Sequence, residues 1–163
     1  LALINQEQTG NPMNVLLTNS GYTGTATLRP TLLNPNYSTG RGVTTAAGLV
    51  PFINATVCST PSATCNFYIQ PSGFGNLQRN ALTGPKFEDT DASLQKTTKL
   101  AERASLVLRI DAFDIFNHVN FSNPNLTAST AAGNTFGLIS ATRSPIGDAG
   151  SARQLQLAAK LVF

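Results

Sequence analysis

The chain has 163 residues, enough for one domain with a sizeable core, and its formal net charge is +3. Charged residues make up only 12% of it, against roughly 25% in soluble domains, and small polar residues take their place. This composition favours extracellular or outer-membrane β-structure over a cytosolic enzyme. The basic residues are scattered, which argues against nucleic-acid binding, and no apolar run reaches the ~20 residues of a membrane helix.

The first half of the chain predicts loops. It begins without a methionine or a signal peptide, so we expect a fragment or a processed product. A short strand is predicted at residues 15–17. Residues 20–85 contain prolines too often for long helices or central strands, and short strands are predicted there at 22–28 and 67–70. So long an irregular stretch usually means a binding loop or a disordered segment.

Two cysteines, Cys58 and Cys65, lie within this loop-rich region. Their neighbours are mostly Thr, Ser, Pro and Asn, and a local disulfide there fits an oxidising compartment. The alternative is a pair of free thiols. Metal binding is not expected, because two ligands are too few and the single histidine, His118, is distant in sequence.

From residue 87 onward the sequence predicts antiparallel strands. Residues 87–98 alternate raggedly, 98–103 form a tight turn, and 104–117 alternate more cleanly. A helix is the alternative for 104–117, because Leu106 and Ile110 also fit a helical stripe, but the β-branched and aromatic content favours a strand. An Asn-rich reversal, a short strand at 136–142 and a loop at 144–150 are predicted to follow.

The last predicted strand, residues 152–163, has the most regular alternation in the chain. Its polar positions are Gln154, Gln156 and Lys160, and its apolar positions are Leu155, Leu157, Ala159, Leu161 and Phe163. A transmembrane barrel strand has this pattern over about 9–11 residues, with its apolar face toward lipid. The alternative is a final strand packed on a soluble core.

The sequence resembles the carboxy-terminal part of TonB-dependent outer-membrane receptors, and the Oar-like group in particular, which carries a carboxypeptidase-regulatory-like domain and is abundant in Acidobacteria. The most specific match reads Arg109-x-Asp111-x-Phe113-Asp114-Ile115-Phe116-Asn117-His118-x-Asn120-Phe121-x-Asn123-Pro124. Asp111 and Asp114 stand where the group more often has Glu and Asn. Gly75 to Phe87 and Arg153 to Phe163 continue the match in the right order.

The resemblance implies an all-β fold: antiparallel strands with long loops, as the last strands of a large transmembrane β-barrel. Residues 1–85 would form outer loops with short strands, and residues 86–163 the carboxy-terminal barrel strands. The family's barrel has about twenty-two strands around a plug. The chain holds neither the plug nor the energy-coupling motif. It cannot close a barrel alone, so its sheet edges need covering or self-association.

The resemblance also implies location and partners. The chain would lie in the bacterial outer membrane and contact its lipid, the amino-terminal barrel and plug, and an unknown scarce nutrient. The outer-membrane assembly machinery would read the terminal strand that ends at Phe163. The alternative is a secreted or cell-surface β-rich protein for adhesion or assembly, which polymerises by strand-edge pairing.

The sequence does not indicate an enzyme, a cofactor or a metal site. His118 could act as a general base with Asp111 or Asp114, but no nucleophile lies in a recognisable elbow, and a turn role is the alternative. A calcium site built from Asp89, Asp91 and Asp111 lacks the expected spacing. Arg109 and Asp111 share one strand face; they are either a structural ion pair or part of a polar wall along the barrel lumen.

Overall fold

The computed structural model describes residues 1–17, 28–71, 73–143 and 152–163, which form strands and loops without a helix. The chain forms two compact units, a sheet unit and a loop unit. The sheet unit comprises Leu1–Thr9, Lys86–Phe121 and Thr142–Phe163. The loop unit comprises Gly10–Pro85 and Ser122–Ala141.

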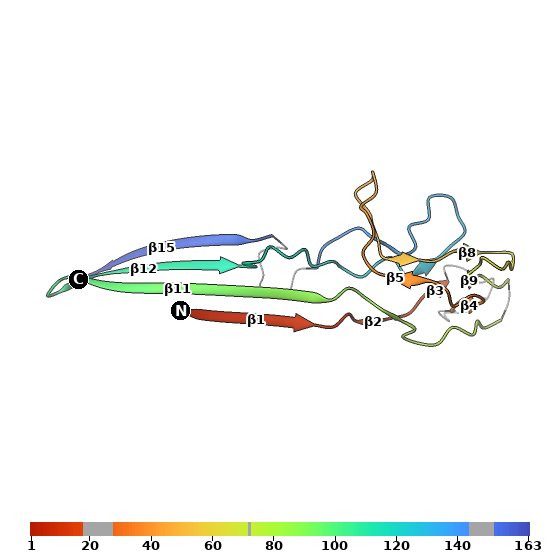
Figure 1. Ribbon diagram of the computed structural model, residues 1–163, viewed down its shortest axis with the longest axis horizontal. Helices are drawn as coiled ribbons and strands as arrows, with labels where there is room; N and C mark the ends of the chain where they lie inside the picture. Colours follow the sequence, from red (N-terminus) through yellow and green to blue (C-terminus); the bar gives the residue numbers. More distant parts are fainter. Residues whose placement is uncertain (18–27, 72, 144–151) are drawn as a thin grey trace. The chain divides into compact units, whose positions relative to one another are not determined.

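The sheet unit is built on four antiparallel strands in the order β1-β11-β12-β15 (Figure 1). Their bounds are β1 Ala2–Gln8, β11 Phe87–Ala101, β12 Ala104–Phe113 and β15 Gln154–Val162. Only Glu102 and Arg103 separate β11 from β12, with a register shift between Lys99 and Ala101. The predicted all-β antiparallel fold is confirmed, and the three predicted carboxy-terminal strands all form.

The end of β12 differs from its predicted limit at residue 117. The strand ends at Phe113 because Asp114 and Asn117 adopt positive φ angles of 45° and 53°. This left-handed backbone region is open mainly to Gly, Asn and Asp, and it takes the chain out of the extended conformation. The helix alternative for residues 104–117 does not form.

Strand β1 was not predicted from the sequence. All seven of its residues are exposed, and apolar residues stand side by side at Leu3 and Ile4, so neither burial nor alternation signals a strand. It forms because its backbone pairs along β11, from Ala2 opposite Ser93 to Gln8 opposite Phe87. The two units consequently differ from the predicted division at residues 85 and 86: residues 1–9 join the strands, and 122–141 join the loops.

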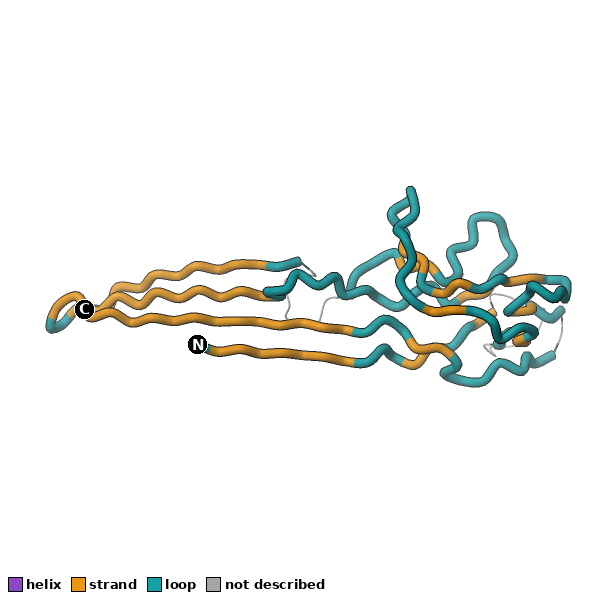
Figure 2. The backbone as a smooth tube through the Cα atoms, in the orientation of Figure 1, coloured by secondary structure: helices purple, strands orange, loops and turns teal. Residues whose placement is uncertain are grey.

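The loop unit contains short strands of two residues each, visible in Figure 2 as brief strand segments between long loops. They are β2 Pro12–Met13, β3 Leu16–Leu17, β4 Thr31–Leu32, β5 Ser38–Thr39, β6 Val50–Pro51, β7 Ile53–Asn54, β8 Val57–Cys58, β9 Phe67–Tyr68, β10 Leu82–Thr83, β13 Thr127–Ala128 and β14 Leu138–Ile139. Two pairings, β3 with β13 and β8 with β9, are parallel, which the sequence did not predict. The strand predicted at 22–28 lies outside the described residues except for residue 28, and the loop predicted at 144–150 lies wholly outside them.

A hydrophobic core holds the loop unit together. Phe67 is fully buried at its centre, with its ring 5.1 Å from Tyr37 and 5.7 Å, edge to face, from Phe136. The other buried members are Met13, Val15, Leu17, Leu28, Ile53, Leu77, Leu82 and Ala128. The described part of the long irregular stretch is therefore packed around this core.

Candidate functional site: two faces of the sheet

The register of the sheet unit gathers large apolar side chains on one face. Residues directly opposite each other on neighbouring strands point to the same side of a sheet. Leu94 lies opposite Ile110, which lies opposite Leu157 on the next strand. Two further rows run parallel to this one. They are Thr98, Leu106 and Leu161 on one side, and Ala92, Ala112 and Leu155 on the other. We call this surface the apolar face.

The apolar face is open on the described part of the chain. Leu155 is 66% exposed, Leu157 79% and Phe163 90%, and Ala159 and Leu161 are exposed as well. An exposed apolar surface of this extent marks a membrane or protein contact in a folded protein. The strand predicted to carry an alternating apolar face thus has one, and none of the residues that the structure describes buries it.

Lys96 is a charged residue on the apolar face. It lies opposite Leu108, which lies opposite Ala159. A lysine can lay its apolar stem along such a surface while its ammonium group reaches a polar boundary. One lysine is therefore compatible with the apolar character of the face.

The opposite face of the sheet is polar. Ser93, Asp111 and Gln156 form one row across β11, β12 and β15. Asp111 Oδ2 lies 2.8 Å from Arg109 Nε, and Ser93 Oγ donates a 2.6 Å hydrogen bond to Asp111 Oδ1. The Arg109 side chain is 54% exposed and that of Asp111 14%. Arg109 and Asp111 therefore form an ion pair, and the position of this face toward a barrel lumen stays a prediction.

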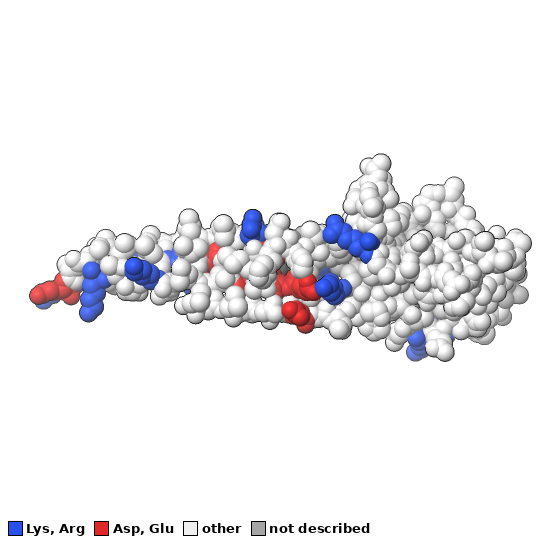
Figure 3. Space-filling model, viewed as in Figure 1, with Lys and Arg blue, Asp and Glu red and all other residues white. Residues whose placement is uncertain are grey.

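Charge is distributed unequally between the units. All eight acidic residues of the sequence fall in segments of the sheet unit, and the loop unit has only Arg29, Arg41 and Arg79. In Figure 3 most of the coloured side chains accordingly lie over the strands of the sheet unit. Asn, Ser, Thr and backbone groups therefore supply most of the polar contacts in the loop unit.

The structure places His118 beside a carboxylate that the sequence analysis did not consider. Its Nδ1 lies 2.8 Å from Glu88 Oε2, and its backbone N–H donates to Asp114 Oδ1 at 3.0 Å. Lys86 also pairs with Glu88, and this carboxylate raises the pKa of Lys86. The His118 side chain thus pairs with neither Asp111 nor Asp114, the partners considered for a general base.

The aspartates considered for calcium make other contacts. Asp91 Oδ1 accepts a hydrogen bond from the backbone N–H of Asp114 at 3.1 Å, and Asp111 accepts from Ser93 and Arg109. Among the described residues, no group of three or more His, Cys, Asp and Glu side chains is placed to hold a metal ion. Asp91 and Asp111 therefore make hydrogen bonds within the sheet unit.

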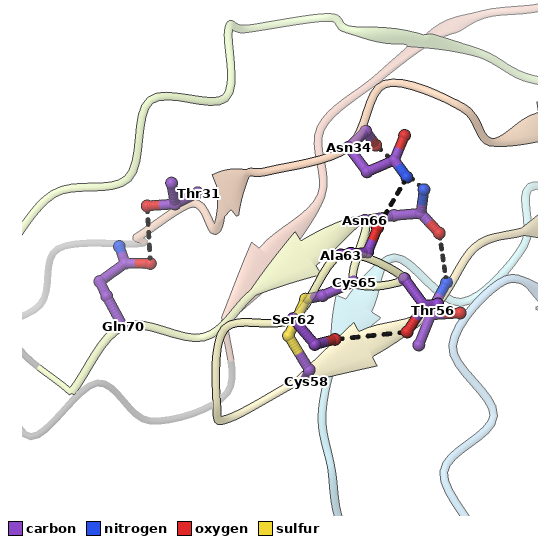
Figure 4. Close-up of a disulfide and its surroundings, with 10 residues drawn as sticks. Thr31, Asn34, Thr56, Cys58, Ser62, Ala63, Cys65, Asn66 and Gln70 are labelled. Atoms are coloured by element: carbon purple, nitrogen blue, oxygen red, sulfur yellow. Dashed lines mark hydrogen bonds between the residues drawn. A yellow bond between two sulfur atoms is a disulfide. The ribbon is translucent and has the colours of Figure 1, made fainter.

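The predicted disulfide between Cys58 and Cys65 is present in the loop unit. The two Cα atoms are 5.9 Å apart, and Cys65 is fully buried (Figure 4). Next to it, the buried Asn66 side chain accepts from Thr56 N at 2.8 Å and donates to the carbonyls of Asn34 and Asn36. The bridge and this amide together fix the path of a loop that has little apolar side chain to bury.

The loop unit also has a hollow of about 370 Å³ on its surface. Its lining combines an aromatic ring and two amide side chains with apolar groups: Leu32, Tyr37, Asn76, Leu77, Gln78 and Ala81. The Asn76 side chain accepts a hydrogen bond from Leu32 N at 2.7 Å, which holds one wall in place. Small-molecule sites commonly have such a mixture, apolar with a few fixed polar groups.

No helix among the described residues is both long and apolar enough to cross a membrane. The sheet, with one apolar and one polar face and long connections at one end, has the features of a transmembrane β-barrel wall. The family described as "Outer membrane beta barrel domain" matches residues 1–156, and the chain belongs to this family. Its location is the bacterial outer membrane. Comparisons with curated proteins and with solved structures found no match.

Membership of this family predicts what surrounds each face of the sheet. The described strands do not close a barrel, so they represent part of a barrel wall. In transmembrane β-barrels generally, the apolar side of the wall contacts lipid and the other side faces the interior. The sequence predicted both kinds of face, but it missed β1 and the Glu88–His118 pair. The two residues of that pair lie on segments far apart in sequence, and only the folded sheet unit brings them together.

Proposed function

We propose that the chain is the carboxy-terminal part of a TonB-dependent outer-membrane receptor that imports a scarce nutrient. The resemblance of residues 109–124 to the Oar-like group carries this proposal. The polar face with the Arg109–Asp111 pair suits a wall along a transport path. The hollow beside Tyr37 and Asn76 suits a first contact with a ligand on an outer loop.

The encoding gene tests the proposal first. Upstream of the codon for Leu1, we expect a plug domain and a short energy-coupling motif, joined by further barrel strands. Cells that lack the gene should then grow poorly only when the imported nutrient is limiting, and deleting the inner-membrane energy transducer should give the same defect. A gene without a plug region, or a growth defect independent of the transducer, would contradict the receptor proposal.

The terminal strand supports a further partner, the outer-membrane assembly machinery. Phe163 is 90% exposed at the end of β15, so its removal costs little packing within the chain. If the machinery reads this aromatic residue, deletion of Phe163 lowers the amount of full-length receptor in the outer membrane severalfold. Phe74→Ala, which truncates an 80% exposed ring in the loop unit, serves as the control. Normal levels without Phe163 would rule out the assembly role.

A surface protein for adhesion or assembly is the second candidate. It is favoured by the two outer strands of the described sheet, β1 and β15, because each pairs on one side only. Unpaired strand edges are templates for pairing with another chain. Purified protein that stays soluble or forms filaments without detergent would support this function, whereas dependence on detergent supports the receptor.

A further inference from the structure

A cleft of about 600 Å³ lies within the sheet unit, beside the strand ends farthest from the Glu102–Arg103 turn. Three segments line it: β1, the start of β11, and the turn that follows β12. The lining residues are Leu3, Asn5, Glu7, Glu88, Asp89, Thr90, Asp114, Ile115, Phe116 and His118. The cleft therefore joins carboxylates to apolar side chains.

Asp114 is the unusual member of this lining. It is only 6% exposed, and its Oδ1 accepts the backbone N–H of His118 at 3.0 Å. Its Oδ2 is buried and has no hydrogen-bond partner among the described residues. A buried carboxylate oxygen without a donor is costly, and such groups in folded proteins usually have a partner. A donor supplied from the cleft would remove this cost.

The neighbouring groups indicate what kind of donor fits. Thr90 Oγ1 is already engaged with Asn5 Oδ1 at 2.7 Å, and Glu88 is engaged with Lys86 and His118. Among the described residues, the cleft offers no group of three or more His, Cys, Asp and Glu side chains placed to hold a metal ion. The remaining requirement is a cationic hydrogen-bond donor, and an ammonium group meets it because its three N–H bonds can reach several oxygens.

The apolar part of the lining indicates what the ammonium group is attached to. Phe116 is 74% exposed and Leu3 67%, although both border a cleft with a buried acid. Aromatic faces attract cations, and apolar side chains cover alkyl groups. We propose that this cleft binds a primary ammonium group attached to an apolar body, with Asp114 Oδ2 as its hydrogen-bond acceptor.

The position of the cleft on the sheet suggests where the ligand comes from. Leu3 lies opposite Ala92, and Asn5 opposite Thr90, so these residues continue the apolar face. In outer-membrane barrels short turns are periplasmic, so the cleft lies toward the cell exterior, near the level of lipid headgroups. Both an aminolipid headgroup and a free alkylamine have the required chemistry. The proposal rests on the barrel family and not on nutrient import.

Asp114→Asn is a conservative test of this site. Asparagine tolerates the positive φ of this position and keeps an oxygen for the His118 N–H, but it loses the negative charge. Asp91→Asn is the matched control, because Asp91 contacts the Asp114 backbone and does not line the cleft. Circular dichroism of both variants verifies that the sheet is retained.

Binding is measured on the chain in phosphatidylcholine nanodiscs, with n-butylammonium as the probe and n-butanol as its neutral counterpart. We expect wild type and Asp91→Asn to bind the ammonium with similar affinity, and Asp114→Asn at least tenfold more weakly. The butanol affinity should be low and equal in all three proteins. Absence of butylammonium binding, or equal binding to wild type and Asp114→Asn, would overturn the proposal.

A second arm separates the two sources. Nanodiscs containing phosphatidylethanolamine offer a primary ammonium headgroup, whereas phosphatidylcholine has no N–H donor. Phosphatidylethanolamine retained on wild type and lost from Asp114→Asn in native mass spectrometry identifies a lipid ligand. Butylammonium binding that persists undiminished in these nanodiscs, without retained lipid, identifies a free amine. Lipid retained equally by wild type and Asp114→Asn counts against Asp114 as the acceptor.

Discussion

The two units place their apolar residues in opposite ways. The loop unit buries its apolar side chains around Phe67, whereas the sheet unit presents Leu108, Ile110 and Leu157 to the outside. Among the described residues, the exposed large apolar side chains all belong to the sheet unit except Leu33, Val43 and Phe74. The loop unit has the interior of a protein folded in water, and the sheet unit has a surface suited to lipid. This difference in exposure is the one expected if water surrounds the loop unit and lipid contacts the sheet unit.

The polar groups of the two units differ in a related way. In the loop unit, buried amides such as Asn66 and Gln70 satisfy backbone groups of segments that lack long strands. In the sheet unit, the hydrogen bonds of the long strand ladders satisfy the backbone, and the polar row of Ser93, Asp111 and Gln156 lies on the face opposite the leucines. The first unit depends on individual side-chain contacts, and the second depends on its ladders and its surroundings.

The largest expected effect is on the core of the loop unit. Phe67→Ala removes a fully buried ring that contacts Tyr37 and Phe136, and such truncations cost about 3–5 kcal/mol. Hydrogen exchange of the Ile69 amide, which donates to the Cys58 carbonyl, measures the loss. Phe74→Ala, at an exposed ring, should leave this exchange rate unchanged. Equal effects of the two substitutions would contradict the assigned core.

A charge on the apolar face should have the next largest effect. Leu157→Arg places a cation in the middle of β15, which costs about 2–4 kcal/mol at the bilayer midplane. Gln156→Arg introduces the same charge on the polar face and should cost much less. Urea titrations of the two variants folded into lipid vesicles give the difference. Similar midpoints for both would mean that the two faces of the sheet are not distinct.

Loss of the disulfide should destabilise only the loop unit. The bridge closes a short loop between residues seven apart, for which chain entropy predicts roughly 2–3 kcal/mol. In a Cys58→Ser, Cys65→Ser double variant, the amides of Asn66 and Phe67 should exchange faster. Amides of β12 should keep their protection, and their acceleration would show that the two units unfold together.

The smallest effect is expected at the ion pair on the polar face. Arg109→Gln removes the charge of a side chain that is more than half exposed. Asp111 keeps its hydrogen bond from Ser93. Exposed pairs contribute little to stability, so the urea midpoint in vesicles should match that of wild type within error. A midpoint shift as large as that of Leu157→Arg would mean that the pair is buried in the complete barrel.

The sequence predicted the elements whose local pattern matches their surroundings. Alternation identified β15, and apolar spacing together with β-branched and aromatic content favoured a strand over a helix for β12. The end of β12 was misplaced because the left-handed backbone at Asp114 leaves no periodic signal. The two-residue strands of the loop unit are set by contacts between distant segments such as β3 and β13, and these contacts could not be predicted from local pattern.

The same difference between local and distant contacts applies to the candidate site. The Arg109–Asp111 pair and the Cys58–Cys65 bridge join residues close in sequence, and both were predicted. The cleft around Asp114 joins β1, β11 and the turn after β12, and β1 itself carries no clear strand pattern. A site that depends on an unrecognised strand cannot be predicted before the sheet order is known.

Contact between the apolar face of the sheet and lipid can be measured directly. The sequence contains no tryptophan, so single Leu157→Trp and Gln156→Trp variants each report one position on β15. The measurement is fluorescence quenching by brominated lipid in vesicles that contain the folded protein. Strong quenching at position 157 and weak quenching at 156 is the predicted result. Equal quenching at the two positions, or stronger quenching at 156, would contradict this contact.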